Sequence, residues 1–358
     1  MVDAQSLVAD AALHDIRAQL ATANAQGQPV SLRGGGTHSF LRPPVGPVVL
    51  ELAAYAGVVA YEPSELVVVA RAGTPLCELE TRLAEHGQRF AFEPPRRSSA
   101  ATLGGVVSAG LAGPARPYTA AVRDHVLGVR LMNSQGELLQ FGGRVMKNVA
   151  GYDVSRLVTG AWGVLGPLME IAVRVVPAPA AERCLRWSLS LEDARAWMRE
   201  AGGRFLPLSG LCYDGAHLHV RWAGSPAAVE AAAAALPRVA VEETADFWRQ
   251  LRDWALPFFA DPRALWRLVL PPNAPALGLP GSWLWDWGGA QRWLKTDVSP
   301  AAVMACAVAA GGYASPFDAA YGLRSGGLSQ VQRALQARVR RSFDPHQLFN
   351  PELSPQDD

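Results

Sequence analysis

Glycine turns and small polar residues recur in two short loops of the chain, a pattern typical of a site that holds a bulky anionic ligand. The first loop reads Arg33-Gly34-Gly35-Gly36-Thr37-His38-Ser39. The second contains Ala101-Thr102-Leu103-Gly104-Gly105, followed by Ser108 and Gly110. Glycine lets backbone N–H groups turn toward an anion because no Cβ stands in the way. The two loops therefore predict a cradle for a cofactor.

A third segment adds more turns and a polar cluster. Lys147-Asn148 precede Gly151-Tyr152-Asp153, and a turn at Gly163-Val164-Leu165-Gly166 leads into an apolar run over 169–176 that includes Ile171. Lys147 is the only lysine in the first 294 residues, which favours a ligand contact over a solvent-facing role. Tyr152 and Asp153 either order the ligand or form an internal hydrogen bond, and the sequence leaves both readings open.

Two common phosphate-binding motifs are disfavoured. The dinucleotide fingerprint needs a helix directly after its glycines, but Phe40-Leu41-Arg42-Pro43-Pro44 follows the first loop and cannot open a helix. A phosphate loop of the Walker type needs glycine and lysine followed by serine or threonine, and the chain has no such tripeptide.

The elements around these loops alternate between helices and strand pairs. Apolar spacing predicts a helix over 6–25 and strands over 29–32, 48–52 and 66–70. Thr74 as cap and Pro75 as first residue predict a helix to about 85. A hairpin is predicted over 126–141, a strand over 169–176, and a domain boundary at the alternating prolines and alanines of 177–180. This order favours an α+β fold over a doubly wound parallel sheet.

Composition narrows the function classes. The 358 residues suggest two domains, and the net charge of +1 with no large basic cluster argues against a nucleic-acid partner. The four cysteines are far apart, so an iron–sulfur cluster or structural zinc within the chain is not expected. Neither a signal peptide nor an apolar run long enough to span a membrane is visible, which predicts a cytoplasmic protein.

Taken together, the loops resemble the FAD-binding domain of the vanillyl-alcohol-oxidase/PCMH superfamily. The resemblance implies a PCMH-type domain of two α+β subdomains over 1–178 and a smaller α+β cap-like domain over 179–325. It also implies that residues 326–358, with Phe343-Asp344-Pro345 and Asn350-Pro351, return to the FAD domain. Both loops, Lys147, Asn148, Gly151, Tyr152, Asp153, Gly163, Leu165, Gly166 and Ile171 would then bind FAD.

The same resemblance bears on how FAD would be held. Some relatives attach the flavin covalently through a histidine that directly follows the glycine pair. In this chain Thr37 takes that place and His38 comes one residue later. We therefore expect non-covalent FAD.

Within the superfamily, the chain resembles the FAD-binding E subunits of bacterial glycolate oxidase. Four segments carry this resemblance: Val145 to Leu157, Leu256 to Phe259, Leu265 to Arg267 and Asp286 to Lys295. The resemblance implies oxidation of glycolate, and often D-lactate, by a complex with a second flavin subunit and an iron–sulfur subunit, peripheral at the inner membrane. The catalytic residues remain unknown because no histidine lies in a defensible catalytic motif. We expect electron transfer or a structural role; a self-sufficient 2-hydroxy-acid dehydrogenase and a flavin-free assembly scaffold are the alternatives.

A metal site is considered and not assigned. Asp214-Gly215-Ala216-His217-Leu218-His219 loosely resembles a metal-binding segment of relatives that oxidise 2-hydroxy acids, and two histidines on one strand face could chelate an ion. However, the outward face of a strand often carries histidines, and the sequence identifies no third ligand.

Overall fold

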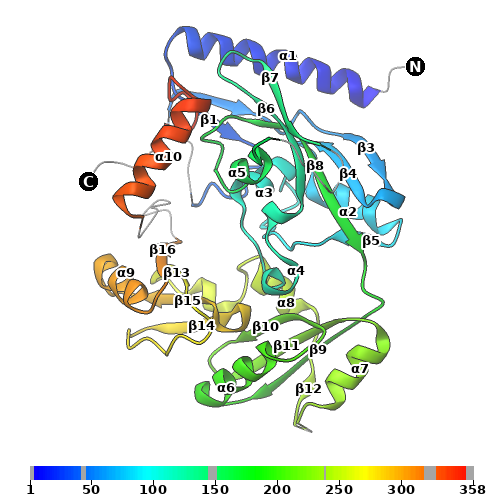
Figure 1. The fold of residues 1–358 in the computed structure, drawn as a ribbon, viewed down its shortest axis with the longest axis vertical. Helices are drawn as coiled ribbons and strands as arrows, with labels where there is room; N and C mark the ends of the chain where they lie inside the picture. The colour runs from blue at the N-terminus through cyan, green and yellow to red at the C-terminus, as the bar shows by residue number, and fades with distance from the viewer. Residues whose placement is uncertain (1–3, 42–45, 144–150, 238, 318–327, 352–358) are drawn as a thin grey trace. The chain divides into compact units, whose positions relative to one another are not determined.

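The computed structural model describes residues 4–41, 46–143, 151–237, 239–317 and 328–351 (Figure 1). The chain divides into two compact units. The first comprises Met1–Leu111, Ala121–Ala178 and Ser329–Asp358, and the second comprises Ala112–Ala120 and Pro179–Leu328. Residues 112–120, which the sequence placed in the first domain, therefore group with the second unit.

The first unit is built on two sheets. A two-stranded parallel sheet pairs β1 (Val30–Arg33) with β2 (Val48–Glu51). A six-stranded antiparallel sheet has the order β3-β4-β8-β6-β7, with β5 paired to β8. Its strands are β3 (Val58–Glu62), β4 (Val67–Arg71), β5 (Gln88–Phe90), β6 (Val126–Met132), β7 (Leu138–Gly142) and β8 (Leu168–Pro177). The helices are α1 (Ala4–Ala25), α2 (Leu76–Ala84), α3 (Leu103–Ala109), α5 (Val154–Val158) and α10 (Gln330–Phe343), with short 3-10 turns η1 (Pro63–Glu65) and η2 (Val122–Asp124).

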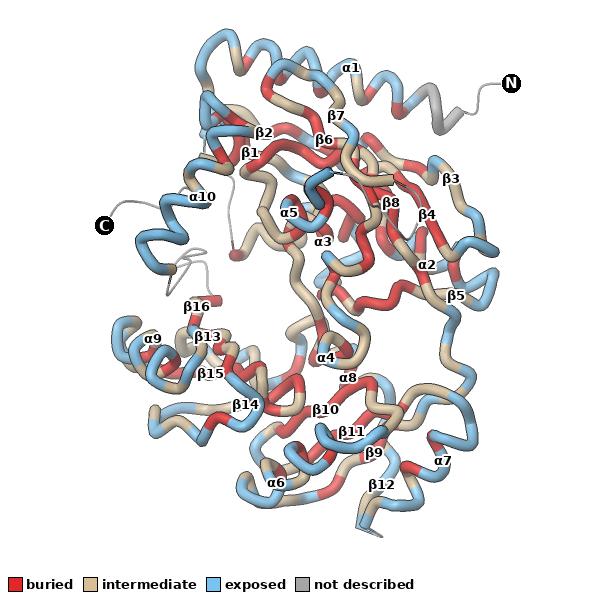
Figure 2. Tube along the Cα trace, in the orientation of Figure 1, coloured by how far each residue is buried: buried red, intermediate tan, exposed pale blue. Residues whose placement is uncertain are grey.

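Each sheet of the first unit has its own core. The face of α1 that carries Ile16 and Leu20 packs with Val30, Leu50 and Phe349 around the small sheet. Apolar residues of α2, α3 and α5 cover the large sheet in a separate cluster. Figure 2 shows this pattern in the alternation of buried and exposed residues along α1 and in the buried central strands. The first unit thus contains two sheets, each with its own helices and core, which is the arrangement of two α+β subdomains that the resemblance implies.

The second unit contains one eight-stranded antiparallel sheet in the order β12-β9-β11-β10-β14-β15-β13-β16. Its strands are β9 (Ala181–Ser188), β10 (Leu208–Tyr213), β11 (His217–Gly224), β12 (Val241–Glu242), β13 (Ala264–Val269), β14 (Ser282–Asp286), β15 (Gln291–Thr296) and β16 (Tyr313–Pro316). The helices are α4 (Arg116–Thr119), α6 (Leu191–Gly202), α7 (Pro226–Ala234), α8 (Asp246–Arg252) and α9 (Pro300–Ala309), with turns η3 (Pro257–Ala260) and η4 (Trp287–Gly289).

One local expectation needs correction. Thr74 does not cap α2, which begins at Leu76 after Pro75 without a side-chain cap. Instead, the Thr74 hydroxyl accepts a hydrogen bond from the Gly57 N–H and donates one to the Arg71 carbonyl. Thr74 is fully buried, so its hydroxyl is satisfied by a neighbouring turn rather than by the helix end.

Among the described helices, none combines the length and apolar character that crossing a bilayer requires.

Candidate functional site

The first glycine loop begins where β1 ends. Arg33 is the last residue of β1 and forms an ion pair with Glu51 at the end of β2. Gly36 has a φ of +67°, in the left-handed region that favours glycine. The N–H groups of Gly34, Gly35 and Gly36 donate no hydrogen bond to any residue that the structure describes. The loop therefore presents backbone donors that a ligand can use.

The second loop lies directly against the first. A Cβ on Gly35 would stand 1.5 Å from the Ala100 carbonyl oxygen, and a Cβ on Gly34 would stand 2.5 Å from the Thr102 hydroxyl. Thr102 caps α3, because its hydroxyl accepts a hydrogen bond from the Gly105 N–H at 3.2 Å. Gly104 is held against β4, with its N–H donating to the Ala72 carbonyl at 2.8 Å. Only glycine permits this approach of the two loops.

A third wall comes from the turn before β8. Trp162 has a φ of +53°, and its N–H donates to the Ser108 carbonyl of α3 at 2.9 Å. Its indole meets the His38 ring edge to face, with centroids 6.1 Å apart. Gly163, with a φ of +74°, then packs against Leu32. This turn therefore connects α3 to the first loop.

The C-terminal segment closes the same region. The Asn350 side-chain oxygen accepts a hydrogen bond from the Leu32 N–H at 2.9 Å, and its amide nitrogen donates to the Trp162 carbonyl at 2.8 Å. The Asn350 backbone N–H also donates to the Val30 carbonyl at 2.9 Å.

These four segments enclose one pocket within the first unit. Thirteen of the residues predicted from the sequence line it: Arg33, Gly34, Gly35, Gly36, Thr37, His38, Ser39, Thr102, Gly104, Gly105, Ser108, Gly163 and Gly166. The lining also contains Ser31, Leu32, Leu52, Ala72, Ala109, Trp162, Pro167, Leu168 and Asn350. Segments far apart in the sequence thus converge on one site.

Other predicted residues lie outside this lining. Leu165 and Ile171 are buried in the core of the large sheet, and Ala101 is buried beside the second loop. Gly110 ends α3 with a φ of +60° and packs against Gly160. These four positions support the walls of the pocket from behind, so a contact with the cofactor stays a prediction for them.

The polar cluster after the hairpin is only partly described. Lys147 and Asn148 lie outside the described residues. Gly151, Tyr152 and Asp153 are exposed, and the Tyr152 side chain is 95% accessible. Asp153 caps α5 by accepting a hydrogen bond from the Arg156 N–H at 3.1 Å. The internal hydrogen bond considered for Asp153 is therefore present.

The pocket is electrostatically suited to an anion. Among its described lining residues, only Arg33 and His38 are titratable, and none is an acid. Burial lowers the pKa of His38 to about 4, with a further contribution from the nearby Arg97 charge. His38 is therefore a neutral imidazole at pH 7, and Arg33, which is ion-paired with Glu51, is the one cation among the described lining residues. The free N–H groups of the first loop, the Arg33 guanidinium and the close approach of Gly34 and Gly35 to the second loop fit the phosphates of a dinucleotide cofactor.

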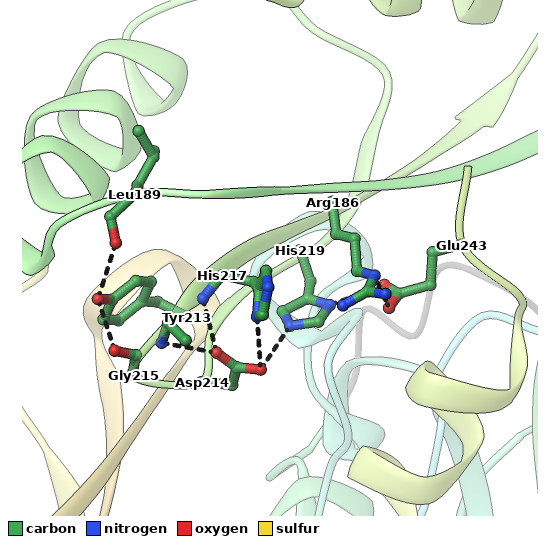
Figure 3. A network of polar contacts seen from close by, with 9 residues as sticks. Arg186, Leu189, Tyr213, Asp214, Gly215, His217, His219 and Glu243 are labelled. Carbon is green, nitrogen blue, oxygen red and sulfur yellow. Dashed lines mark hydrogen bonds and ion pairs between the residues drawn. The ribbon is translucent and has the colours of Figure 1, made fainter. Parts of the chain in front are cut away.

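A second polar cluster lies in the other unit, on β10 and β11 (Figure 3). His219 is almost fully buried, and its two ring nitrogens contact the Asp214 carboxylate at 3.0 Å and the Glu243 carboxylate at 2.7 Å. The His217 ring lies 3.6 Å from the same Asp214 carboxylate.

Asp214 supplies the third potential metal ligand, which the sequence did not identify. One ligand atom from each of Asp214, His217 and His219 lies within 4.8 Å of the others. Burial alone would lower the pKa of His219, but its hydrogen bonds to Asp214 and Glu243 raise it above the usual 6.5. Both ring N–H groups of a protonated His219 therefore have a carboxylate partner within the cluster. The expectation that no metal binds here stays a prediction.

Comparisons with known proteins agree with the site. The FAD binding domain family matches residues 5–142. Glycolate oxidase subunit GlcE of Escherichia coli (strain K12) is 43% identical over 326 residues, which cover 90% of this chain and 91% of that protein. Glycolate oxidase subunit GlcD of Bacillus subtilis (strain 168) is 29% identical over 161 residues, 44% of this chain and 34% of that one.

A solved structure of alkyldihydroxyacetonephosphate synthase superposes with a TM-score of 0.66 at 14% identity, covering 94% of this chain and 73% of that one. At this identity the likeness concerns the fold alone, which is the PCMH type. The chain belongs to the FAD-binding family of glycolate oxidase subunit GlcE.

Proposed function

We propose that this chain is the FAD-holding subunit of a glycolate oxidase complex, and that it transfers electrons or supports assembly rather than oxidising the substrate itself. The observation that carries the proposal is the pocket of the first unit. Its glycine loops, Arg33 and the neutral His38 suit a dinucleotide, and no acidic side chain stands among its described lining residues. The identity to a GlcE subunit over nine tenths of the chain supports the identification of the complex.

In this proposal the two loops hold the pyrophosphate of non-covalent FAD. The backbone N–H groups of Gly34, Gly35 and Gly36 donate to it, and Arg33 balances its charge. FAD supplies the redox chemistry, because its ring accepts two electrons and passes them on. Thr102, Gly104 and Gly105 position the second loop, while the other predicted residues support the walls.

The proposed partners are a second flavin subunit, which would bind glycolate or D-lactate, and an iron–sulfur subunit that takes the electrons onward. A separate protein named as the GlcD subunit of glycolate oxidase is related to this chain, which supports the presence of a second flavin subunit. We propose a cytoplasmic complex that is peripheral at the inner membrane.

The test of this division of labour is anaerobic reduction by glycolate. The purified chain, loaded with FAD, should keep its flavin oxidised when glycolate is added alone. The same flavin should be reduced once the partner flavin subunit is present. Turnover of glycolate by the chain alone at the rate of the complex would show a self-sufficient dehydrogenase, and a chain that takes up no FAD would indicate an assembly scaffold.

A further inference from the structure

The side chain of Asn350 connects two walls of the cofactor pocket. Its carboxamide oxygen accepts from the Leu32 N–H, directly before the first glycine loop, and its nitrogen donates to the Trp162 carbonyl in the turn before β8. Asn350 itself lines the pocket. Because one planar group bridges both backbones, any change in its position moves both walls.

The packing around the carboxamide leaves little freedom. A Cβ on Gly163 would stand 2.8 Å from the Asn350 amide nitrogen and 2.9 Å from a Leu32 methyl carbon. Asn350 is 1% exposed, so its carboxamide has little access to water in place of its two partners. Removal of the carboxamide would leave the Leu32 N–H and the Trp162 carbonyl without a partner. An unsatisfied buried backbone group costs free energy, so loss of these hydrogen bonds is destabilising.

The residue type matches both the bonds and the backbone. Asn350 has a φ of +45°, a conformation that asparagine adopts more readily than most residues with a Cβ. A carboxamide also offers one acceptor and one donor, which is what the two walls require. Aspartate retains the acceptor only, and glycine retains the backbone conformation only.

The segment that carries Asn350 is fixed to the first unit by several further bonds. The Val30 N–H donates to the Leu348 carbonyl at 2.8 Å, and the Asn350 N–H donates to the Val30 carbonyl. The buried Asp344 carboxylate accepts from the Phe349 N–H at 2.8 Å, and Arg340 donates to the Phe349 carbonyl at 2.7 Å. In the sequence, this segment follows the whole of residues 179–328, which form the larger part of the second unit.

We infer that Asn350 is a positioning residue for the cofactor, through which docking of the C-terminal segment sets the geometry of the FAD pocket. The inference rests on the proposed role of this pocket in holding FAD. The pocket is then complete only after residue 350 has been synthesised and has docked beside β1. Tight cofactor binding therefore follows synthesis of the chain through residue 350, which includes the second unit.

The test compares Asn350→Gly and Asn350→Asp with the parent chain. The dissociation constant for FAD is measured by titration of the apoprotein, and the visible circular dichroism of the flavin is recorded at saturating FAD. Asn350→Gly should raise the dissociation constant about tenfold or more, which corresponds to about 1.4 kcal/mol. It should also alter the flavin dichroism. Asn350→Asp should also raise the dissociation constant and alter the dichroism, because it retains the acceptor for the Leu32 N–H but places a buried carboxylate against the Trp162 carbonyl and in the pocket lining.

Asn133→Gly is the matched control. The Asn133 side-chain oxygen accepts from the N–H groups of Gln135 and Glu137 in the hairpin turn, away from the pocket lining. This control should lower stability without changing FAD affinity or dichroism. An FAD dissociation constant within twofold of the parent for Asn350→Gly, or equal effects at positions 350 and 133, would overturn the inference. Should Asn350→Gly fail to fold, the same criteria apply to Asn350→Asp. A parent chain that binds no FAD would overturn the proposed function together with this inference.

Discussion

Replacement of Gly35 by alanine is the smallest change that should separate the two loops of the pocket. The added Cβ would lie 1.5 Å from the Ala100 carbonyl oxygen, whereas real Cβ atoms essentially never come closer than 3.0 Å to such an atom. The loops must therefore move apart by at least 1.5 Å. The obstacle is backbone on both sides, so no change of side-chain rotamer can relieve it.

The cost of this movement should appear in cofactor binding. Overpacking of a fitted contact costs about 1–3 kcal/mol, and a backbone obstacle places Gly35→Ala at the upper end. Because Gly35 is half-buried, the loop of the apoprotein can relax outward, and FAD binding must then reverse that movement. A cost of about 3 kcal/mol predicts an FAD dissociation constant raised roughly 100-fold.

Isothermal titration of the apoprotein with FAD measures this change, with two alanine variants for comparison. A Cβ on Gly105 would lie 3.2 Å from the Thr102 hydroxyl, which requires only a small adjustment, so Gly105→Ala should retain most of the affinity. Gly202 has no atom within 4 Å of an added Cβ, so Gly202→Ala should match the parent. Parent-like FAD affinity in Gly35→Ala would refute the assignment of these loops to the cofactor.

Three further outcomes follow from the described contacts. The pKa of His219 in the folded state is raised above 6.5, so its contribution to stability is present below about pH 6.5 and is lost as the pH rises through that raised value. Thermal unfolding measured from pH 6 to 9 should therefore show a steeper loss of stability for the parent than for His219→Gln, and parallel curves would contradict this. Thr102→Val removes the hydroxyl that accepts a hydrogen bond from the Gly105 N–H, and it should lower the free energy of unfolding by about 1 kcal/mol in urea titrations. An unchanged urea midpoint would exclude this cap as a stabilising contact. Arg33→Gln should weaken FAD binding most at low salt, whereas Glu51→Gln should not; equal effects in the two variants would indicate that only their ion pair matters.

Much of the pocket could be predicted from the sequence because its constraints are local. Gly36 and Gly163 adopt positive φ, and Gly35 touches another backbone, so each restricts its position to glycine. Thr102 likewise indicates a helix start, because its hydroxyl accepts a hydrogen bond from the N–H of Gly105, three residues later. Such constraints leave a mark on residue type within a few positions of the chain.

The remaining parts depend on contacts between distant segments. The Asn350 side chain bonds to Leu32 across 318 positions. Only the resemblance of Phe343-Asp344-Pro345 and Asn350-Pro351 to the family's terminal segment predicted that this segment returns to the domain. Trp162 gave no signal, since a tryptophan with positive φ cannot be read from its neighbours. Glu243 likewise gave no signal, because it lies 24 positions from His219, whereas Asp214 is only five residues from His219 in the segment singled out from the sequence. Thr74 illustrates the reverse case, because its fit to a capping pattern was overridden by the buried turn at Gly57.

The measurement that tests the central claim most directly is an absorption spectrum of the purified chain, recorded before and after denaturation. The account predicts flavin bands from about one FAD per chain and their complete release into the soluble fraction when the protein is denatured and precipitated. Flavin that stays with the precipitate would contradict non-covalent binding. A colourless chain that takes up no added FAD would contradict the claim that the glycine loops hold this cofactor.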